Sequence, residues 1–208
     1  MTIELVYLTV FWSIAYLLAI FHAVRFKRHA IPAFSVSLNF AWELVALVYY
    51  FEPIDIVWTI LDAVIVLCLV KELIREKNKH LFDYCCCFLI YGVICVLCFN
   101  RPFPGQMTGY VFLSFFMDLL MAINFWWEYR KKHHINIITI MVALFRMLGD
   151  AVAWLIYRHI TTVFILGSVI FVLNVAFLAF VSYECFVQKR MKRSTVSIYT
   201  KTIKEEEK

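Results

Sequence analysis

The stretch TVFILGSVIFVLNVAFLAFVSYECFV, residues 162–187, contains no Lys or Arg and only one acid. A helix crosses the roughly 30 Å hydrocarbon core of a bilayer with about 20 apolar residues, at about 1.5 Å per residue. This stretch meets that requirement. Six further apolar segments precede it in the chain, at about residues 3–24, 31–51, 54–70, 81–99, 110–129 and 135–157. The sequence therefore predicts an all-α, polytopic membrane protein with seven transmembrane helices.

The composition agrees with this class. Hydrophobic residues make up 63% of the chain, charged residues only 17%, and the mean hydropathy is +0.80. An ordinary soluble domain carries roughly 25% charged residues, so this composition excludes one. We expect an integral membrane protein in contact with membrane lipid, in the plasma membrane if the source is prokaryotic.

The orientation follows from the Lys and Arg residues between the segments. Fourteen of them follow segments one, three, five and seven, whereas the other connections carry only Arg101 and Arg158. The positive-inside rule then places the N-terminus outside and the C-terminus in the cytoplasm. We expect a membrane domain over residues 1–187 and a partly disordered, basic and then acidic cytoplasmic tail over 188–208. The net charge of +5 belongs to this cytoplasmic rim, so we expect no nucleic-acid partner.

Four carboxylates lie inside four different apolar segments. They are Glu43, Asp62, Asp118 and Asp150. Each is about eight residues from the predicted outer end of its segment, which places it about 12 Å deep. Ionisable groups in hydrocarbon are costly and mark functional sites by default. We expect the four carboxylates to ring a single cavity in the outer half of the membrane domain.

Two of these acids have polar neighbours four residues away. Asn39 shares a helix face with Glu43, and Arg146 is spaced to form an ion pair with Asp150. Four ionised carboxylates against one arginine would leave three uncompensated charges in a low dielectric, so at least one carboxyl stays protonated. We expect Glu43 to be the protonated acid and Asp150 to be ionised. Trp42 lies at the same depth and offers an aromatic face to a cation.

The cysteines and glycines point to no bound group. All seven cysteines fall in apolar segments, and the single C-x-x-C of Cys95 and Cys98 has no second pair or suitably spaced His to complete a zinc site. The five glycines form no phosphate-binding loop. The sequence therefore predicts free thiols, no metal site and no cofactor.

The motif NFAWE, residues 39–43 in the second apolar segment, resembles the N-x-A-W-E signature of a known family. The family comprises the small membrane-embedded terpene cyclases, namely the paxilline-type indole-diterpene cyclases, the fungal meroterpenoid cyclases and their bacterial relatives. Asp62 falls where those cyclases tend to carry Asn or Asp, and FRMLG, residues 145–149, is similar to their S-R-F-L-G-type segment. The resemblance covers about residues 1–190.

The resemblance implies a metal-independent cyclisation of a lipid-soluble prenyl compound. Glu43 would protonate an epoxide or terminal alkene of the substrate. Asn39 and Asp62 would orient or reprotonate Glu43, and Trp42 would stabilise the resulting cation. The family's second important acid lies in the seventh helix, where the nearest residue of this chain is Asn174. Either Asp118 or Asp150 takes over the role of that acid, or this protein carries out different chemistry. The candidate catalytic residues are Glu43, Asp62, Asp118 and Asp150, and the candidate substrate-binding residues are Asn39, Trp42, Arg146 and Asn174.

Two other functions fit parts of the sequence. A small proton-coupled transporter or channel would use the carboxylate layer to bind a proton or a cationic or lipophilic solute. The chain shows no inverted repeat, and few Gly or Pro residues interrupt its segments, which argues against a transporter. A retinal-type receptor has less support still, because the seventh segment contains no lysine.

Overall fold

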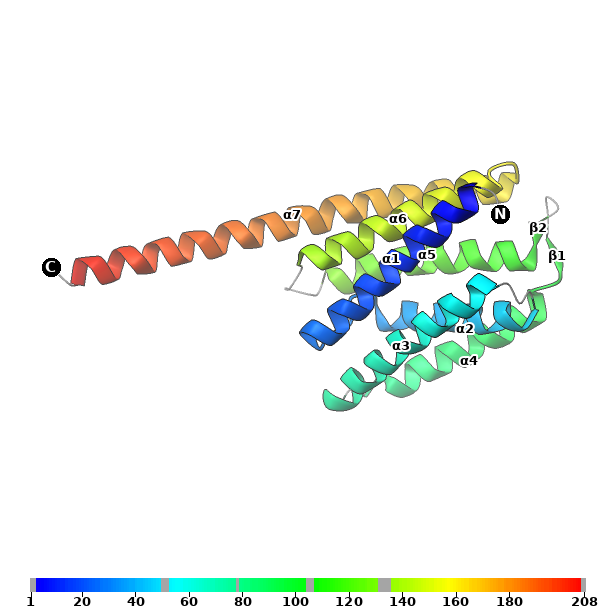
Figure 1. The fold of residues 1–208 in the computed structure, drawn as a ribbon, viewed down its shortest axis with the longest axis horizontal. Helices are drawn as coiled ribbons and strands as arrows, with labels where there is room; N and C mark the ends of the chain where they lie inside the picture. The colour runs from blue at the N-terminus through cyan, green and yellow to red at the C-terminus, as the bar shows by residue number, and fades with distance from the viewer. Residues whose placement is uncertain (1–2, 50–52, 78, 104–106, 131–135, 207–208) are drawn as a thin grey trace.

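The computed structural model describes residues 3–49, 53–77, 79–103, 107–130 and 136–206. Over these residues the chain is all-α, with seven helices and one short antiparallel strand pair, as Figure 1 shows. The helices are α1 (Ile3–Phe26), α2 (Ala33–Tyr49), α3 (Pro53–Arg75), α4 (Leu81–Cys98), α5 (Gly109–Tyr129), α6 (Ile137–Tyr157) and α7 (Thr161–Glu206), and the strands are β1 (Pro102–Phe103) and β2 (Met107–Thr108). The all-α class and the positions of the seven helices are confirmed.

Six of these helices are long and apolar enough to cross a membrane, as expected of a multi-pass membrane protein. The exception is α2, which has 17 residues and would be about 25 Å long. Most of α2 is buried, and it packs against α3, α4 and α5. A helix covered by protein does not need to match the lipid thickness, which accounts for its length. The orientation of the bundle stays a prediction.

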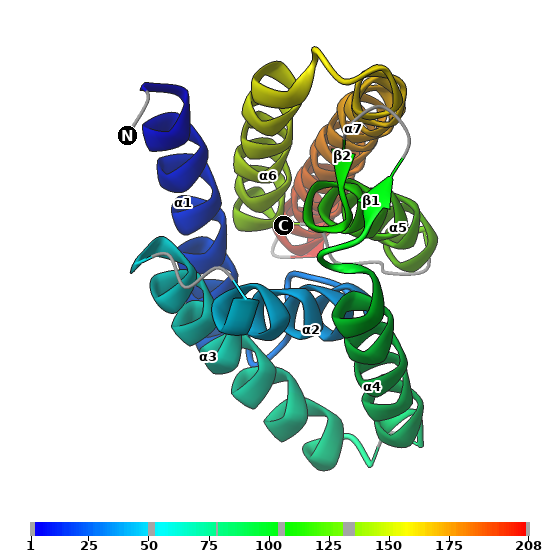
Figure 2. The same cartoon turned by 90° about the vertical axis from the view of Figure 1, so that its right-hand side faces the viewer.

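The helices pack in a closed ring, visible end-on in Figure 2. Going round, α1 packs on α6, α6 on α7, α7 on α5, α5 on α2, α2 on α3, and α3 returns to α1. The remaining helix, α4, lies outside this ring against α2 and α5. The ring matters because five of its six members line the cavity described below.

Two glycines allow close approaches between helices, one at the corner between α4 and α5 and one between the ring helices α1 and α6. A Cβ atom at Gly109 would lie 1.7 Å from the carbonyl oxygen of Cys98, so the corner between α4 and α5 excludes any side chain there. Hydrogen bonds from the amides of Gly109 and Tyr110 to the carbonyls of Arg101 and Phe99, both 2.9 Å, hold this corner. At Gly149 in α6, a Cβ atom would lie 2.6 Å from Cδ1 of Trp12 in α1. The missing side chain therefore lets α1 and α6 pack closely.

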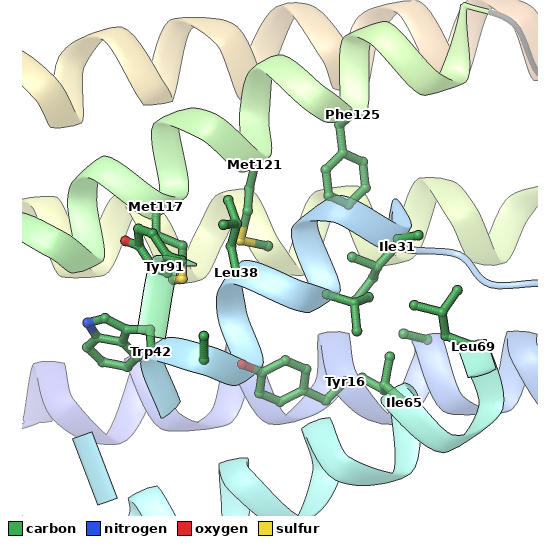
Figure 3. Close-up of a cluster of buried hydrophobic side chains, with 14 of the residues drawn as sticks. Tyr16, Ile31, Leu38, Trp42, Ile65, Leu69, Tyr91, Met117, Met121 and Phe125 are labelled. Carbon is green, nitrogen blue, oxygen red and sulfur yellow. The ribbon is translucent and has the colours of Figure 1, made fainter. Parts of the chain in front are cut away.

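The hydrophobic core lies where α2 meets its neighbours (Figure 3). Leu38 and Trp42 of α2 lie beside Met117 and Met121 of α5 and Tyr91 of α4, and all five are buried. From the other side, Tyr16 of α1 extends its hydroxyl group toward α2. This hydroxyl is a polar group in an otherwise apolar cluster, and it belongs to the candidate site described below.

The last helix continues beyond the bundle in Figure 1. Residues Thr161–Val187 form its apolar part, and the helix ends at Glu206. The predicted boundary between the membrane domain (1–187) and the tail (188–208) therefore falls inside α7. Disorder of the tail stays a prediction.

Candidate functional site

A cavity of about 500 Å³ lies inside the helix ring. Its wall includes Leu5 and Ile54 from the first turns of α1 and α3, Tyr110 at the start of α5, and Tyr157 at the end of α6. The cavity therefore occupies the end of the bundle where the N-terminus lies. The charge pattern of the sequence assigns this end to the outside.

Aromatic side chains make up much of the cavity wall. The aromatic lining residues are Trp12, Tyr16, Trp42, Trp58, Tyr110, Phe115 and Tyr157. The rings of Trp42 and Tyr110, from α2 and α5, pack with their centres 5.1 Å apart. Aromatic faces attract cations through their quadrupole, and they do so most strongly where water is excluded. The wall can therefore accommodate a positively charged species inside an apolar space.

Glu43 lies in this wall, at the centre of a short hydrogen-bonded chain. Its side chain is only 2% exposed, and the hydroxyl of Tyr16 donates a 3.2 Å hydrogen bond to Oε1. The amide of Asn39 donates to the Tyr16 hydroxyl at 2.8 Å and also to Oδ2 of Asp62. We call these four residues the Glu43 chain. The chain joins α1, α2 and α3.

The Glu43 chain is buried, and no cation in the described part of the protein compensates its carboxyls. Its other three members are 2 to 4% exposed, and no Lys or Arg of the described part pairs with either carboxyl. The second carboxyl oxygen of Glu43, Oε2, is buried without a hydrogen-bond partner among the described residues. Two neighbouring carboxyls without a cation repel each other when both are ionised, so this arrangement favours a proton on one of them.

The other two predicted acids form a separate group, the Arg146 cluster, made up of Asp118, Arg146, Asp150 and Asn174. Nη2 of Arg146 lies 3.6 Å from Oδ2 of Asp150, so the predicted ion pair within α6 is confirmed. Asn174 of α7 donates a 2.7 Å hydrogen bond to the same Oδ2 atom. Arg146 also donates to the backbone carbonyl of Asp118 at 3.3 Å, and its guanidinium carbon lies 4.7 Å from the centre of the Phe125 ring.

The expectation that the four carboxylates ring one cavity is wrong. Glu43 and Asp118 line the cavity, whereas Asp62 and Asp150 stand behind them as hydrogen-bond and ion-pair partners. The predicted substrate-binding residues divide in the same way. Asn39 and Trp42 are in the wall, but Arg146 and Asn174 are not among the lining residues. Position along the chain gives the place of each acid along its helix, but it does not give the direction in which each helix turns its side chains.

Sequence reasoning missed several polar residues of the cavity wall, including Tyr16 and Asp55. Tyr16 holds the Glu43 chain together, and Asp55 lines the cavity with 3% exposure. Tyr residues in membrane helices collect at the interfaces, so a Tyr in the middle of the first apolar segment was a usable signal. Asp55 lies in the first turn of its helix, where an acid is ordinary. Nothing in the sequence separates it from a helix-end residue.

The described residues offer no obvious metal site. No group of three or more His, Cys, Asp or Glu side chains among them is arranged to hold a metal ion. The seven cysteines are free thiols. Of the four predicted acids, Glu43 accepts a hydrogen bond from a hydroxyl group and Asp62 from an amide, while Asp150 contacts an amide and a guanidinium group.

A different polar group ties the opposite end of the bundle. His29, between α1 and α2, contacts Glu72 of α3 through Nδ1 at 2.9 Å and Glu128 of α5 through Nε2 at 3.0 Å. Its backbone amide donates to the same Glu72 carboxylate at 2.6 Å. These contacts hold the segment between α1 and α2 against α3 and α5. Both helices also line the cavity, but the His29 contacts lie at the ends of these helices that are far from it.

Comparison with protein-family models, with curated proteins and with solved structures finds no match for this chain.

Proposed function

We propose that this protein is a membrane-embedded terpene cyclase in which Glu43 protonates a prenyl chain and starts ring closure through a carbocation. The observation that carries the proposal is the place of Glu43, a buried carboxyl in the wall of an aromatic-lined cavity within the membrane bundle. The NFAWE motif around it, which resembles the signature of such cyclases, supports the same reaction.

The substrate is a lipid-soluble prenyl or polyprenyl compound that reaches the cavity from the membrane. A protonated Glu43 transfers its proton to an alkene carbon or an epoxide oxygen of this chain. A general acid in this position contributes about 10² to 10⁴ in rate. The proposed reaction uses no cofactor, because the proton and the electrons of the new carbon–carbon bonds come from Glu43 and the substrate.

The other members of the Glu43 chain, Tyr16, Asn39 and Asp62, position the Glu43 carboxyl. Tyr16 donates to Glu43 and fixes one carboxyl oxygen, while Asn39 donates to both Tyr16 and Asp62. An amide N–H donates hydrogen bonds but is a poor proton relay, so Asp62 orients Asn39 rather than reloading Glu43 through it. This favours orientation over reprotonation, the two roles that the sequence left open for Asn39 and Asp62.

The aromatic wall supplies the second requirement of the reaction. A carbocation that forms beside Trp42 and Tyr110 is in contact with their ring faces, which stabilise positive charge without adding a nucleophile that would trap it.

The test compares Glu43→Gln with wild type and with Glu184→Gln, a matched substitution at a half-buried residue of α7 outside the cavity wall. Cells expressing each chain receive prenyl quinones, prenyl aromatics or linear terpenoids, and extracts are searched for a cyclised isomer of unchanged mass. Wild type and Glu184→Gln should form it, and Glu43→Gln should form at least about 100-fold less. Full activity of Glu43→Gln would refute the proposal.

The same variants also test the alternative function, a proton-coupled transporter or channel. Vesicles that contain the protein would then show proton or solute flux that depends on Glu43, with no cyclised product in any extract. This result would replace the cyclase proposal with the transporter or channel.

A further inference from the structure

We infer that Asp118 of α5 is the base that ends the cyclisation, taking the place of the seventh-helix acid that the resemblance to terpene cyclases implies. This inference rests on the proposed function. It concerns the fate of the carbocation after Glu43 has started the reaction.

Asp118 has the position that such a base requires. Among the four membrane acids, Asp118 and Glu43 line the cavity, and Asp118 is the most exposed of the four at 8%. Its side chain is still more than nine-tenths buried, and its Oδ1 atom has no hydrogen-bond partner among the described residues. A carboxyl at the cavity wall with a free oxygen is able to accept a proton from a ligand in that cavity.

Asp150 does not have this position. Its Oδ1 atom also lacks a hydrogen-bond partner among the described residues, but its Oδ2 atom contacts Arg146 at 3.6 Å and Asn174 at 2.7 Å, and Asp150 is absent from the cavity wall. Asn174, the residue at the expected seventh-helix position, is occupied as the donor to Asp150. Of the two acids that the sequence left open for the final proton, the geometry selects Asp118.

The acid and the base belong to different polar groups. Among the residues that the structure describes, the Glu43 chain holds two carboxyls without a paired cation, whereas the Arg146 cluster holds two carboxyls beside one guanidinium. Arg146 also anchors the backbone of α5 at Asp118 through its 3.3 Å hydrogen bond to the carbonyl oxygen. Arg146 supplies one positive charge to the two carboxyls of its cluster and pairs directly with Asp150, so the role as base requires the Asp118 carboxyl to be ionised without an ion-pair partner of its own.

The proton balance of the reaction closes with these two residues. The O–H bond of Glu43 breaks, and its proton adds to the alkene or to the epoxide, whose C–O bond opens. Carbon–carbon bonds then form, a C–H bond next to the final cation breaks, and its electrons form a double bond while the proton moves to the Asp118 carboxylate. The product is an isomer of the substrate, and solvent returns one proton from Asp118 to Glu43 in each cycle.

The test follows product identity in the full-length protein, reconstituted in membranes with a substrate that wild type converts. Asp118→Asn should still consume substrate, but its products should shift to water-trapped alcohols or to isomers with a displaced double bond. Asp118→Glu, which retains a carboxyl, should restore the wild-type alkene. Asp83→Asn, a matched change at an exposed residue of α4, should leave the products unchanged. If Asp118→Asn does not fold, Asp118→Ser replaces it with the same expected result.

The outcomes separate this inference from the proposed function. If wild type converts no prenyl substrate, the cyclase proposal itself fails. If wild type is active and Asp118→Asn gives the wild-type alkene in wild-type proportion, only the present inference is overturned. A complete block of substrate consumption in Asp118→Asn, with the fold intact, would also overturn it, because Asp118 would then act at the start of the reaction.

A binding measurement gives a second readout that needs no turnover. Farnesyl dimethylamine, cationic at neutral pH, imitates the charge of the intermediate, and farnesol is its neutral reference. In Glu43→Gln protein, adding Asp118→Asn should weaken amine binding by a factor of about 30 or more and leave farnesol binding nearly unchanged. Equal effects on the two ligands would contradict a charged Asp118 facing the cavity.

Discussion

Replacing Tyr16 with Phe should destabilise the protein through the loss of one hydroxyl group. This hydroxyl donates to Glu43 at 3.2 Å and accepts from Asn39 at 2.8 Å, and the side chain is 3% exposed. The substitution leaves Glu43 without its hydrogen bond in a site where Oε2 already has no partner. A buried polar group that loses its partner costs about 1 to 3 kcal/mol, so we expect the free energy of unfolding to fall by this amount.

The measurement is thermal unfolding followed by a thiol-reactive fluorophore. Cys95 is fully buried in α4, so in a background where it is the only cysteine its labelling reports unfolding. Tyr7→Phe, which removes the hydroxyl of an exposed tyrosine on the same helix, is the matched control and should leave the transition unchanged. For a chain of this size, 1 to 3 kcal/mol corresponds to about 2 to 12 °C.

A double-mutant cycle decides whether the Glu43 chain acts as a unit. Asn39→Leu removes the amide that donates to both Tyr16 and Asp62. Combined with Tyr16→Phe, it should show a coupling energy above about 0.5 kcal/mol, because the two residues share a hydrogen bond. Additive effects within that limit, or a Tyr16→Phe variant as stable as wild type, would refute the reasoning.

Two further substitutions test the packing around the cavity. Gly109→Ala places a Cβ atom 1.7 Å from the backbone oxygen of Cys98 and should destabilise the protein by about 3 kcal/mol or more. The measurement is the yield of folded protein in detergent, which should fall. A normal yield would contradict the geometry of the corner between α4 and α5. Asn174→Asp replaces the donor to Asp150 with a second carboxyl, and it should lower the free energy of unfolding by about 1.5 to 3 kcal/mol in the thiol assay. The products should not change. Unchanged stability would argue against the 2.7 Å hydrogen bond.

The residues that the sequence predicted correctly are those governed by local rules. Apolar length alone located all seven helices to within a few residues, except that α3 and α7 continue beyond their predicted ends. The Arg146–Asp150 ion pair was predictable because positions four apart share a face of one helix. The same rule placed Asn39 and Glu43 on one face, and the structure links them through Tyr16 rather than directly.

The sequence by itself determined that this chain is a bundle of apolar helices and how deep each acid lies in it, because hydrophobic length and spacing along one helix are properties of neighbouring residues. Only the tertiary structure decided which acids face the cavity. It joined Glu43 to Tyr16, a residue of another helix, and it placed Asp118 beside Arg146 of α6, outside the Glu43 chain. The physical reason is that the rotation of each helix about its axis is set by packing between helices, and residues distant in the chain determine that packing.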